Sequence, residues 1–122
     1  MTESEWRTHM LRGPGAFIPI KTVSEANTRE HWRQRAARTK QNRWAGAYWT
    51  RAKYPTLVLP ATVTLTRYGP RELDNDNLGG SFKALRDGIA DAFGVDDGDA
   101  RYAWVYRQER SRWHGVRIEI NQ

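Results

Sequence analysis

Eight carboxylates lie between residues 72 and 99 of a chain that is otherwise strongly basic. Two of them, Asp74 and Asp76, are separated by one residue and follow a stretch rich in β-branched residues. On extended backbone, such a pair projects to the same side. Carboxylate oxygens that share a side are ligands that Mg²⁺ or Mn²⁺ prefers. The spacing therefore indicates a divalent-cation site.

Polar residues also recur on one face of the helix that we expect from about residue 77 to residue 93. They follow steps of four, three, four and four: Asp76, Gly80, Lys83, Asp87 and Asp91. This stripe lies about 100° around the helix from the apolar one, at the edge of the buried face, where solvent can reach it. A lysine there can hold a phosphate oxygen or a developing negative charge. Three further acids would close the site if the chain folds back after the helix: Asp96, Asp97 and Asp99.

Two other interpretations of the acidic segment are weaker. Aspartates are common in helix caps and polar turns, but that does not explain why acids and a lysine recur on one helix face. An EF-hand loop beginning at Asp74 would need a ligand at its fifth position and a glutamate at its twelfth. Those positions hold Leu78 and Leu85, so an EF-hand is excluded.

Charge alternates along the sequence between basic and acidic blocks, within a net charge of +6. Residues 29–53 hold eight cations and one acid, and residues 72–99 hold eight acids and two cations. Residues 101–122 hold five arginines and two glutamates. A basic protein attracts polyanions, most often nucleic acid. The acidic block would repel nucleic acid alone, but not nucleic acid that brings a divalent cation.

Composition excludes several classes of function. The 122 residues include no cysteine, so disulfides, thiolate metal sites and a cysteine nucleophile are excluded. The length is that of one domain. The N-terminus lacks the apolar run of a signal peptide, and no stretch is long enough to span a bilayer. We therefore expect a cytoplasmic protein with no membrane partner.

Local patterning predicts an α+β fold with a small mixed sheet and two main helices, in the order β-α-β-α-β-β. Strands are expected at residues 15–20, 56–69, 100–110 and 115–121. The last two would form an antiparallel hairpin. We expect residues 1–14 to be a flexible N-terminal segment and residues 15–122 to be a single domain.

The two helices differ in their patterning. The first is basic, has weak apolar periodicity and would fray before Pro55. Thr22 or Ser24 would cap it, and Glu25 would complete a capping box with Thr22. The second carries an apolar stripe that would face the sheet: Leu78, Phe82, Leu85, Ile89 and Phe93.

The acidic segment resembles the RusA-type Holliday-junction endonucleases, a family often carried by phages and prophages. The shared pattern is a strand followed by D-x-D-N-L, then a helix with K-x-x-x-D, then a pair of aspartates. Here it runs from Asp74 to Leu78, from Lys83 to Asp87, and through Asp96 and Asp97. The basic stretch at 23–43 is also similar to phage members. Lys83 follows Asp76 by seven residues, whereas the spacing in the family is four. The three added residues make nearly one helical turn, so the lysine would stay on roughly the same helix face.

The resemblance implies a RusA-like nuclease domain that acts as a homodimer and cuts branched DNA, such as a four-way junction, in two symmetric strands. It implies dependence on Mg²⁺, for which Mn²⁺ would substitute. By position, the catalytic residues would be Asp74, Asp76 and Asp97, with Lys83 assisting. Asp96 and Asp99 are further candidate ligands for the metal. Which of Asp96, Asp97 and Asp99 is the third metal ligand stays open.

The basic residues supply candidate contacts to DNA. Candidate phosphate contacts are Arg29, Arg33, Arg38, Lys40, Arg43 and Arg71. Candidate stacking residues for unpaired bases are Trp32, Trp44, Tyr48 and Trp49, although each could instead pack in the core or at a dimer interface. Two alternatives to an enzyme stay open: a non-catalytic nucleic-acid-binding protein with a structural cation, and a structural phage protein whose acidic patch is a docking surface.

Overall fold

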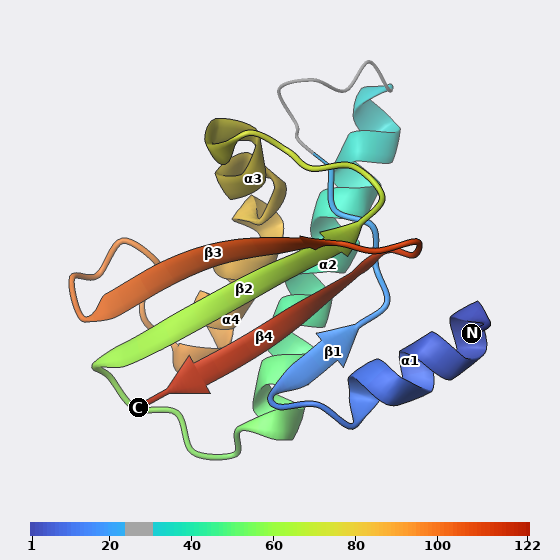
Figure 1. Cartoon of the computed structure of the whole chain (residues 1–122). Helices are drawn as coiled ribbons and strands as arrows, with labels where there is room; N and C mark the ends of the chain where they lie inside the picture. Colours follow the sequence, from blue (N-terminus) through green and yellow to red (C-terminus); the bar gives the residue numbers. More distant parts are fainter. Residues whose placement is uncertain (24–30) are drawn as a thin grey trace.

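The computed structural model describes residues 1–23 and 31–122 and shows an α+β fold (Figure 1). Its four strands are β1 (Ala16–Ile18), β2 (Ala61–Gly69), β3 (Tyr102–Arg110) and β4 (Gly115–Asn121). Its helices are α1 (Glu3–Leu11), α2 (Trp32–Lys53), α3 (Asn75–Ser81) and α4 (Lys83–Phe93). The predicted fold class is confirmed, with α1 added and the second main helix divided into α3 and α4. No helix among the described residues is long and apolar enough to cross a membrane.

The sheet has the strand order β1-β4-β2-β3 and is mixed. β2 runs parallel to β3 and antiparallel to β4, and β1 runs antiparallel to β4. The predicted hairpin of the last two strands is therefore wrong, because β2 lies between them. The link from β3 to β4 passes the end of β2, where Ser111 N donates to Gly69 O at 2.9 Å. Two strand spacings are about 10 Å, a distance that the four linking residues can span.

The sheet separates two apolar clusters. Because side chains alternate along a strand, Val63 and Leu65 of β2 face the helix side, where they are fully buried with α4. Tyr68 faces the other side and packs with Trp6 of α1 and Phe17 of β1. The helix-side cluster is the larger of the two and holds the predicted apolar stripe of α3 and α4.

The N-terminal segment folds as α1 and is not the flexible segment that we expected. Thr2 and Glu5 form a reciprocal capping box, with Glu5 N to Thr2 Oγ1 at 3.2 Å and Thr2 N to Glu5 Oε1 at 3.0 Å. The buried Arg117 of β4 holds the other end, because its Nη2 donates to Met10 O at 2.7 Å. Trp6 and Met10 are both buried, so α1 covers a face of the sheet.

The predicted helices need two corrections, one at the start of the first helix and one inside the second. α2 begins at Trp32, and its N-cap is His31, whose Nδ1 accepts from Arg33 N at 3.2 Å. Thr22 is buried and non-helical. Ser24 and Glu25, the other residues of the predicted cap, lie outside the described residues. The second helix breaks at Phe82, where φ is −95° and ψ is −3°. Two glycines just before the break lower helix propensity there.

A close crossing of α2 and α4 fixes the helix layer. Gly46 of α2 lies against Leu85, such that a Cβ on Gly46 would lie 2.6 Å from Leu85 O. Gly88 of α4 lies against Arg43, and a Cβ on Gly88 would overlap the carbonyl oxygen of Arg43. The backbones of the two helices therefore touch through glycines, and side chains at these positions would force the helices apart.

Replacing Gly88 by Ala should destabilise the fold by about 2–3 kcal/mol, since the new methyl group meets backbone that cannot rotate away. The matched control is Gly80→Ala in α3, where a Cβ would meet nothing within 4 Å. That change should leave stability equal or raise it by up to about 1 kcal/mol, because Ala favours helix. Urea unfolding followed by circular dichroism measures both. A Gly88→Ala protein as stable as the parent would contradict the close crossing.

Candidate functional site

The acidic residues come from two segments of the structure. The first is the start of α3, which follows β2 and reaches the end of β3. Asp74 is the N-cap of α3: its Oδ1 accepts from Asn77 N at 2.9 Å and its Oδ2 from the Asn77 side-chain amide at 3.0 Å. Asp76 lies in the first turn of α3. The pair is therefore not on the extended backbone that we expected, and residues two apart in a helix do not share a face. Both carboxylates are on exposed residues, so solvent and a ligand can reach them.

Gln108 anchors this start of α3 to the sheet. Leu73 N donates to Gln108 Oε1 at 2.9 Å, and Gln108 Nε2 donates to Leu73 O at 2.7 Å. The reciprocal pair fixes the backbone immediately before Asp74. Gln108 was not among the residues predicted from sequence, because a single glutamine within a strand pattern carries no signal of this role.

The second segment is the loop between α4 and β3, which folds back along α4 as the sequence suggested. Lys83 Nζ lies 2.8 Å from Asp87 Oδ1 and 3.4 Å from Asp97 Oδ2. The structure therefore brings Lys83 together with Asp87, which shares its predicted stripe, and with Asp97. The hydrogen bond to Asp87 is the main cause that raises the pKa of Lys83, so the ammonium group stays charged.

Arg86 holds Asp97 in place and was missed by the sequence analysis. Its Nε donates to Asp97 Oδ2 at 2.7 Å, its Nη2 to Asp97 O at 3.2 Å and its Nη1 to the Tyr106 hydroxyl at 2.7 Å. The guanidinium lies over the ring of Trp104 at 4.6 Å, and Trp104 Nε1 donates to Asp97 O at 3.0 Å. A signal for Arg86 existed, because it and Lys83 are the cations of the acidic block.

Opposing effects set the pKa of Asp97. Partial burial acts to raise it, while the hydrogen bond from Arg86 and the charge of Lys83 lower it, and the net result is a pKa below the usual value. For the cation Arg86, burial acts in the other direction and lowers the pKa. Its hydrogen bonds to Tyr106 and Asp97 outweigh burial, so the pKa of Arg86 is raised. At neutral pH, Asp97 is therefore an ionised carboxylate between two cations.

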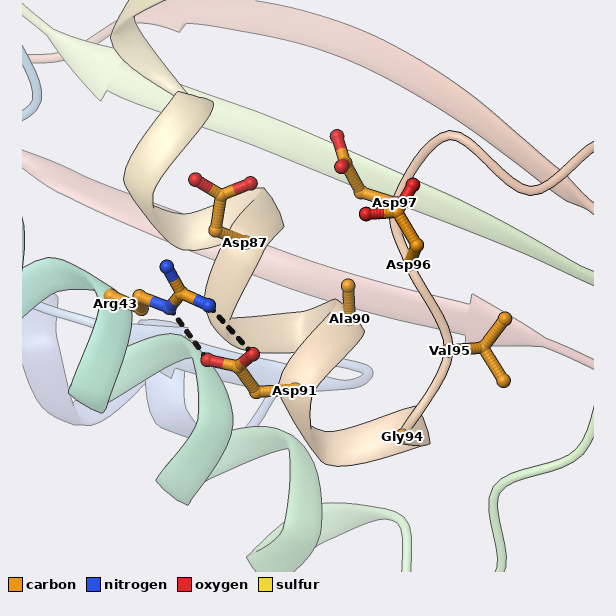
Figure 2. A pocket seen from close by; sticks show the side chains of 8 residues that line it. All are labelled: Arg43, Asp87, Ala90, Asp91, Gly94, Val95, Asp96 and Asp97. Carbon is orange, nitrogen blue, oxygen red and sulfur yellow. Dashed lines mark hydrogen bonds and ion pairs between the residues drawn. The ribbon is translucent and has the colours of Figure 1, made fainter.

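A cavity of about 330 Å³ lies between α4 and the loop that follows it (Figure 2). Figure 2 shows Asp87 on one side of it and Asp96 and Asp97 on the other. At the edge of the cavity, Arg43 of α2 donates two hydrogen bonds to Asp91, from Nε to Oδ2 at 2.7 Å and from Nη2 to Oδ1 at 2.8 Å. This pair raises the pKa of Arg43 and lowers that of Asp91. Arg43, a candidate phosphate contact, thus also joins α2 to α4.

Asp96 and Asp99 make the polar turn that precedes β3. Asp96 Oδ2 accepts from Gly98 N at 3.0 Å. Asp99 Oδ1 accepts from both the backbone N and the Nε of Arg101, and its Oδ2 accepts from Nη2 at 3.0 Å. The hydrogen bonds from Arg101 lower the pKa of Asp99 to about 2. Of the three acids after α4, Asp97 is therefore the one held beside Lys83.

The donor set fits a hard divalent cation in type but is not a closed cage. Across residues 1–23 and 31–122, no three acidic or histidine side chains lie close enough to share an ion. Asp76 is on α3 and Lys83 begins α4, with the break at Phe82 between them, so they do not lie on the one continuous helix face that we expected. Mg²⁺ is commonly held by one or two carboxylates together with substrate phosphates and water. Asp74 and Asp76, both exposed at the start of α3, are the candidate carboxylates for such an ion.

The other candidate DNA contacts lie mainly on the surface of α2. Trp32 is 66% exposed, and Arg33 and Lys40 are exposed. Arg38 is half-buried, and Arg29 lies outside the described residues. Arg71 is exposed and precedes α3, and its carbonyl oxygen accepts from Arg67 Nη1 at 2.6 Å. The structure thus places cations both on α2 and next to the α3 acids.

Replacing Asp97 by Asn should lower the free energy of unfolding at pH 7 by about 1 kcal/mol, because partly exposed charged hydrogen bonds are lost. The folded pKa of Asp97 is depressed, so its contribution is present above the unfolded pKa of about 3.9 and is lost as pH falls through the folded value. The difference between parent and variant should therefore shrink from pH 5 to pH 2.

Urea unfolding at a series of pH values measures this difference, and Asp96→Asn is the control. Asp96 lies in the same turn and makes one bond, to Gly98 N, which an asparagine oxygen can also accept. A difference between the parent and Asp97→Asn that stays constant down to pH 2 would contradict the ion-pair interpretation.

Comparison with known proteins gives one relative and no function. The chain is 40% identical over 86 residues to a protein of Xylella fastidiosa strain Temecula1 that is named only as an uncharacterized protein. The match covers 65% of this chain and 56% of that protein, so the chain spans little more than half of the relative's length. No protein-family model matches the chain. No solved structure matches it.

Proposed function

We propose that this chain is a metal-dependent endodeoxyribonuclease that cleaves branched DNA, such as a four-way junction, by phosphodiester hydrolysis. The observation that carries the proposal is the group around Lys83. Its ammonium lies 2.8 Å from Asp87 and 3.4 Å from Asp97, on the helix that follows the exposed acids of α3. Acids with a lysine beside them, next to a basic helix, suit the cleavage of a polyanion.

Each residue has a role that follows from its surroundings. Asp74 and Asp76 would hold Mg²⁺, or Mn²⁺ in its place, and the bound ion would lower the pKa of a water and offset charge on the phosphate. Lys83 stays protonated because its pKa is raised, so it can donate to a phosphate oxygen. Asp97 orients Lys83. Arg86 is a positioning residue, since it acts on Asp97 and not on the DNA.

The basic helix α2 would bring the DNA to these acids. Its exposed Arg33 and Lys40, together with Arg71 before α3, would contact phosphates and fix the position of the DNA without reading its sequence. Two coordinated cuts require two sites, so the active species would be a homodimer. The place of action would be the cytoplasm of a bacterial or phage-infected cell.

Asp76→Asn should lower the rate of cleavage of a synthetic four-way junction in Mg²⁺ by about 100-fold or more. Binding of the junction in EDTA should stay within about 2-fold, because the change removes one exposed charge. Glu72→Gln is the matched control, since it removes an exposed acid from the same segment without a proposed role. The measurement is gel analysis of end-labelled junction, beside a linear duplex of the same sequence.

Full cleavage by Asp76→Asn would overturn the role of that carboxylate. A parent protein that binds the junction tightly in EDTA but never cuts it in Mg²⁺ or Mn²⁺ would instead support the non-catalytic nucleic-acid-binding alternative.

A further inference from the structure

One face of α2 carries aromatic side chains that the two apolar clusters of the fold do not use. Trp44 is 63% exposed, Tyr48 48% and Trp49 37%. The rings of Trp44 and Tyr48 stack with centroids 5.0 Å apart and planes 10° apart, and Tyr48 meets Trp49 edge-on at 5.2 Å. We call these three residues the α2 aromatic cluster. Large apolar surface that stays exposed in this way marks a binding face.

Hollows flank the cluster on both sides. One, of about 630 Å³, lies between α2 and the end of β1 and is lined by Ile18, Trp44 and Trp49, with Lys40 among its polar residues. The other, of about 340 Å³, is lined by Trp44 and Tyr48 with Arg51. Both volumes are in the range of small-ligand sites, which are mostly apolar with a few polar groups. Trp44 lines both hollows. Because Tyr48 is stacked on one face of its ring, a flat ligand can lie against the other face.

The positive charge of α2 indicates which kind of partner this face would bind. Lys40, Trp44, Tyr48 and Arg51 follow steps of four, four and three, which places the cations at the two ends of one aromatic stripe. α2 holds cations and no acid: Arg33, Arg35, Arg38, Lys40, Arg43, Arg51 and Lys53. A symmetric dimer through this face would set the same charges against one another. A polyanion that carries flat apolar groups suits both features.

We propose that the α2 aromatic cluster binds unpaired nucleotides of single-stranded DNA. Bases would stack on Trp44 and Tyr48 and enter the hollow beside Trp49, while Lys40 and Arg51 would contact the flanking phosphates. The inference rests on the proposed function for its class of partner and adds a contact to bases that are unstacked or unpaired at a branch, which a linear duplex does not offer. It does not depend on metal or on cleavage.

The test is equilibrium binding in EDTA, measured by fluorescence anisotropy of a labelled 20-nucleotide poly-dT. An abasic strand of equal length serves as a probe with the same charge and no bases. The parent should bind poly-dT at least about 10-fold more tightly than the abasic strand. Trp44→Leu, and independently Tyr48→Leu, should each weaken poly-dT binding by about 5- to 10-fold and change abasic binding by less than 2-fold. Val58→Ala, which alters an exposed apolar residue outside α2, should change neither.

Two outcomes would overturn the inference. One is equal binding of poly-dT and the abasic strand by the parent. The other is a parent dimer that Trp44→Leu converts to monomer, by light scattering, with no loss of poly-dT binding, which would make this face a contact between copies. Poly-rU in a parallel arm distinguishes RNA from DNA: tighter binding of poly-rU than of poly-dT would overturn the assignment to DNA.

The same variants separate this inference from the proposed nuclease. If Trp44→Leu binds poly-dT as the parent does while the parent still cuts junctions in Mg²⁺, the inference fails and the nuclease stands. If poly-dT binding depends on Trp44 but the parent cuts nothing, the inference stands and the nuclease fails.

Discussion

The arrangement of this protein depends on the close crossing of α2 and α4 through Gly46 and Gly88. Backbone meets backbone at this crossing, so the basic helix lies directly against the helix that carries Lys83. The crossing sets Arg43 opposite Asp91, where two charged hydrogen bonds form. A side chain at either glycine would move both the aromatic face of α2 and the acids away from these positions. A packing constraint thus sets the distance between the surface that would bind DNA and the residues that would act on it.

The carboxylates of the acidic block fall into two groups in this structure. In the first group the acids form ion pairs within the molecule: Asp91 pairs with Arg43 of α2, and Asp99 pairs with Arg101 in the turn before β3. Asp97 is fixed by Arg86 and is shared with Lys83. The acids at the start of α3 are exposed, and there a cation would be most accessible. The basic flanks of the sequence therefore neutralise part of the acidic block within the molecule and leave another part open to solvent.

The local features of the fold were predictable from sequence, and the non-local ones were not. The apolar stripe from Leu78 to Ile89 is buried as predicted, because its spacing alone selects one helix face. The hairpin prediction was wrong, because a short link between strands does not reveal that β2 separates them. The helix α1 was missed since its cap is local but its stability comes from contacts of Trp6 with Phe17 and Tyr68. In the site, the structure places Lys83 beside Asp97, two residues that the sequence pattern had named. Arg86 and Gln108 act through contacts with β3, whose position the sequence did not show.

Amide NMR with Mn²⁺ tests whether the acids at the start of α3 hold a divalent cation. Paramagnetic Mn²⁺ broadens signals of nearby amides, and titration in the presence of junction DNA supplies the phosphates that complete a Mg²⁺-type shell. The expected result is that the amides of residues 74–77 broaden first, that Lys83 follows, and that α1 is unaffected. If broadening began in the turn at 96–99, or if it left residues 74–77 unchanged with DNA bound, the proposed placement of the metal would be contradicted.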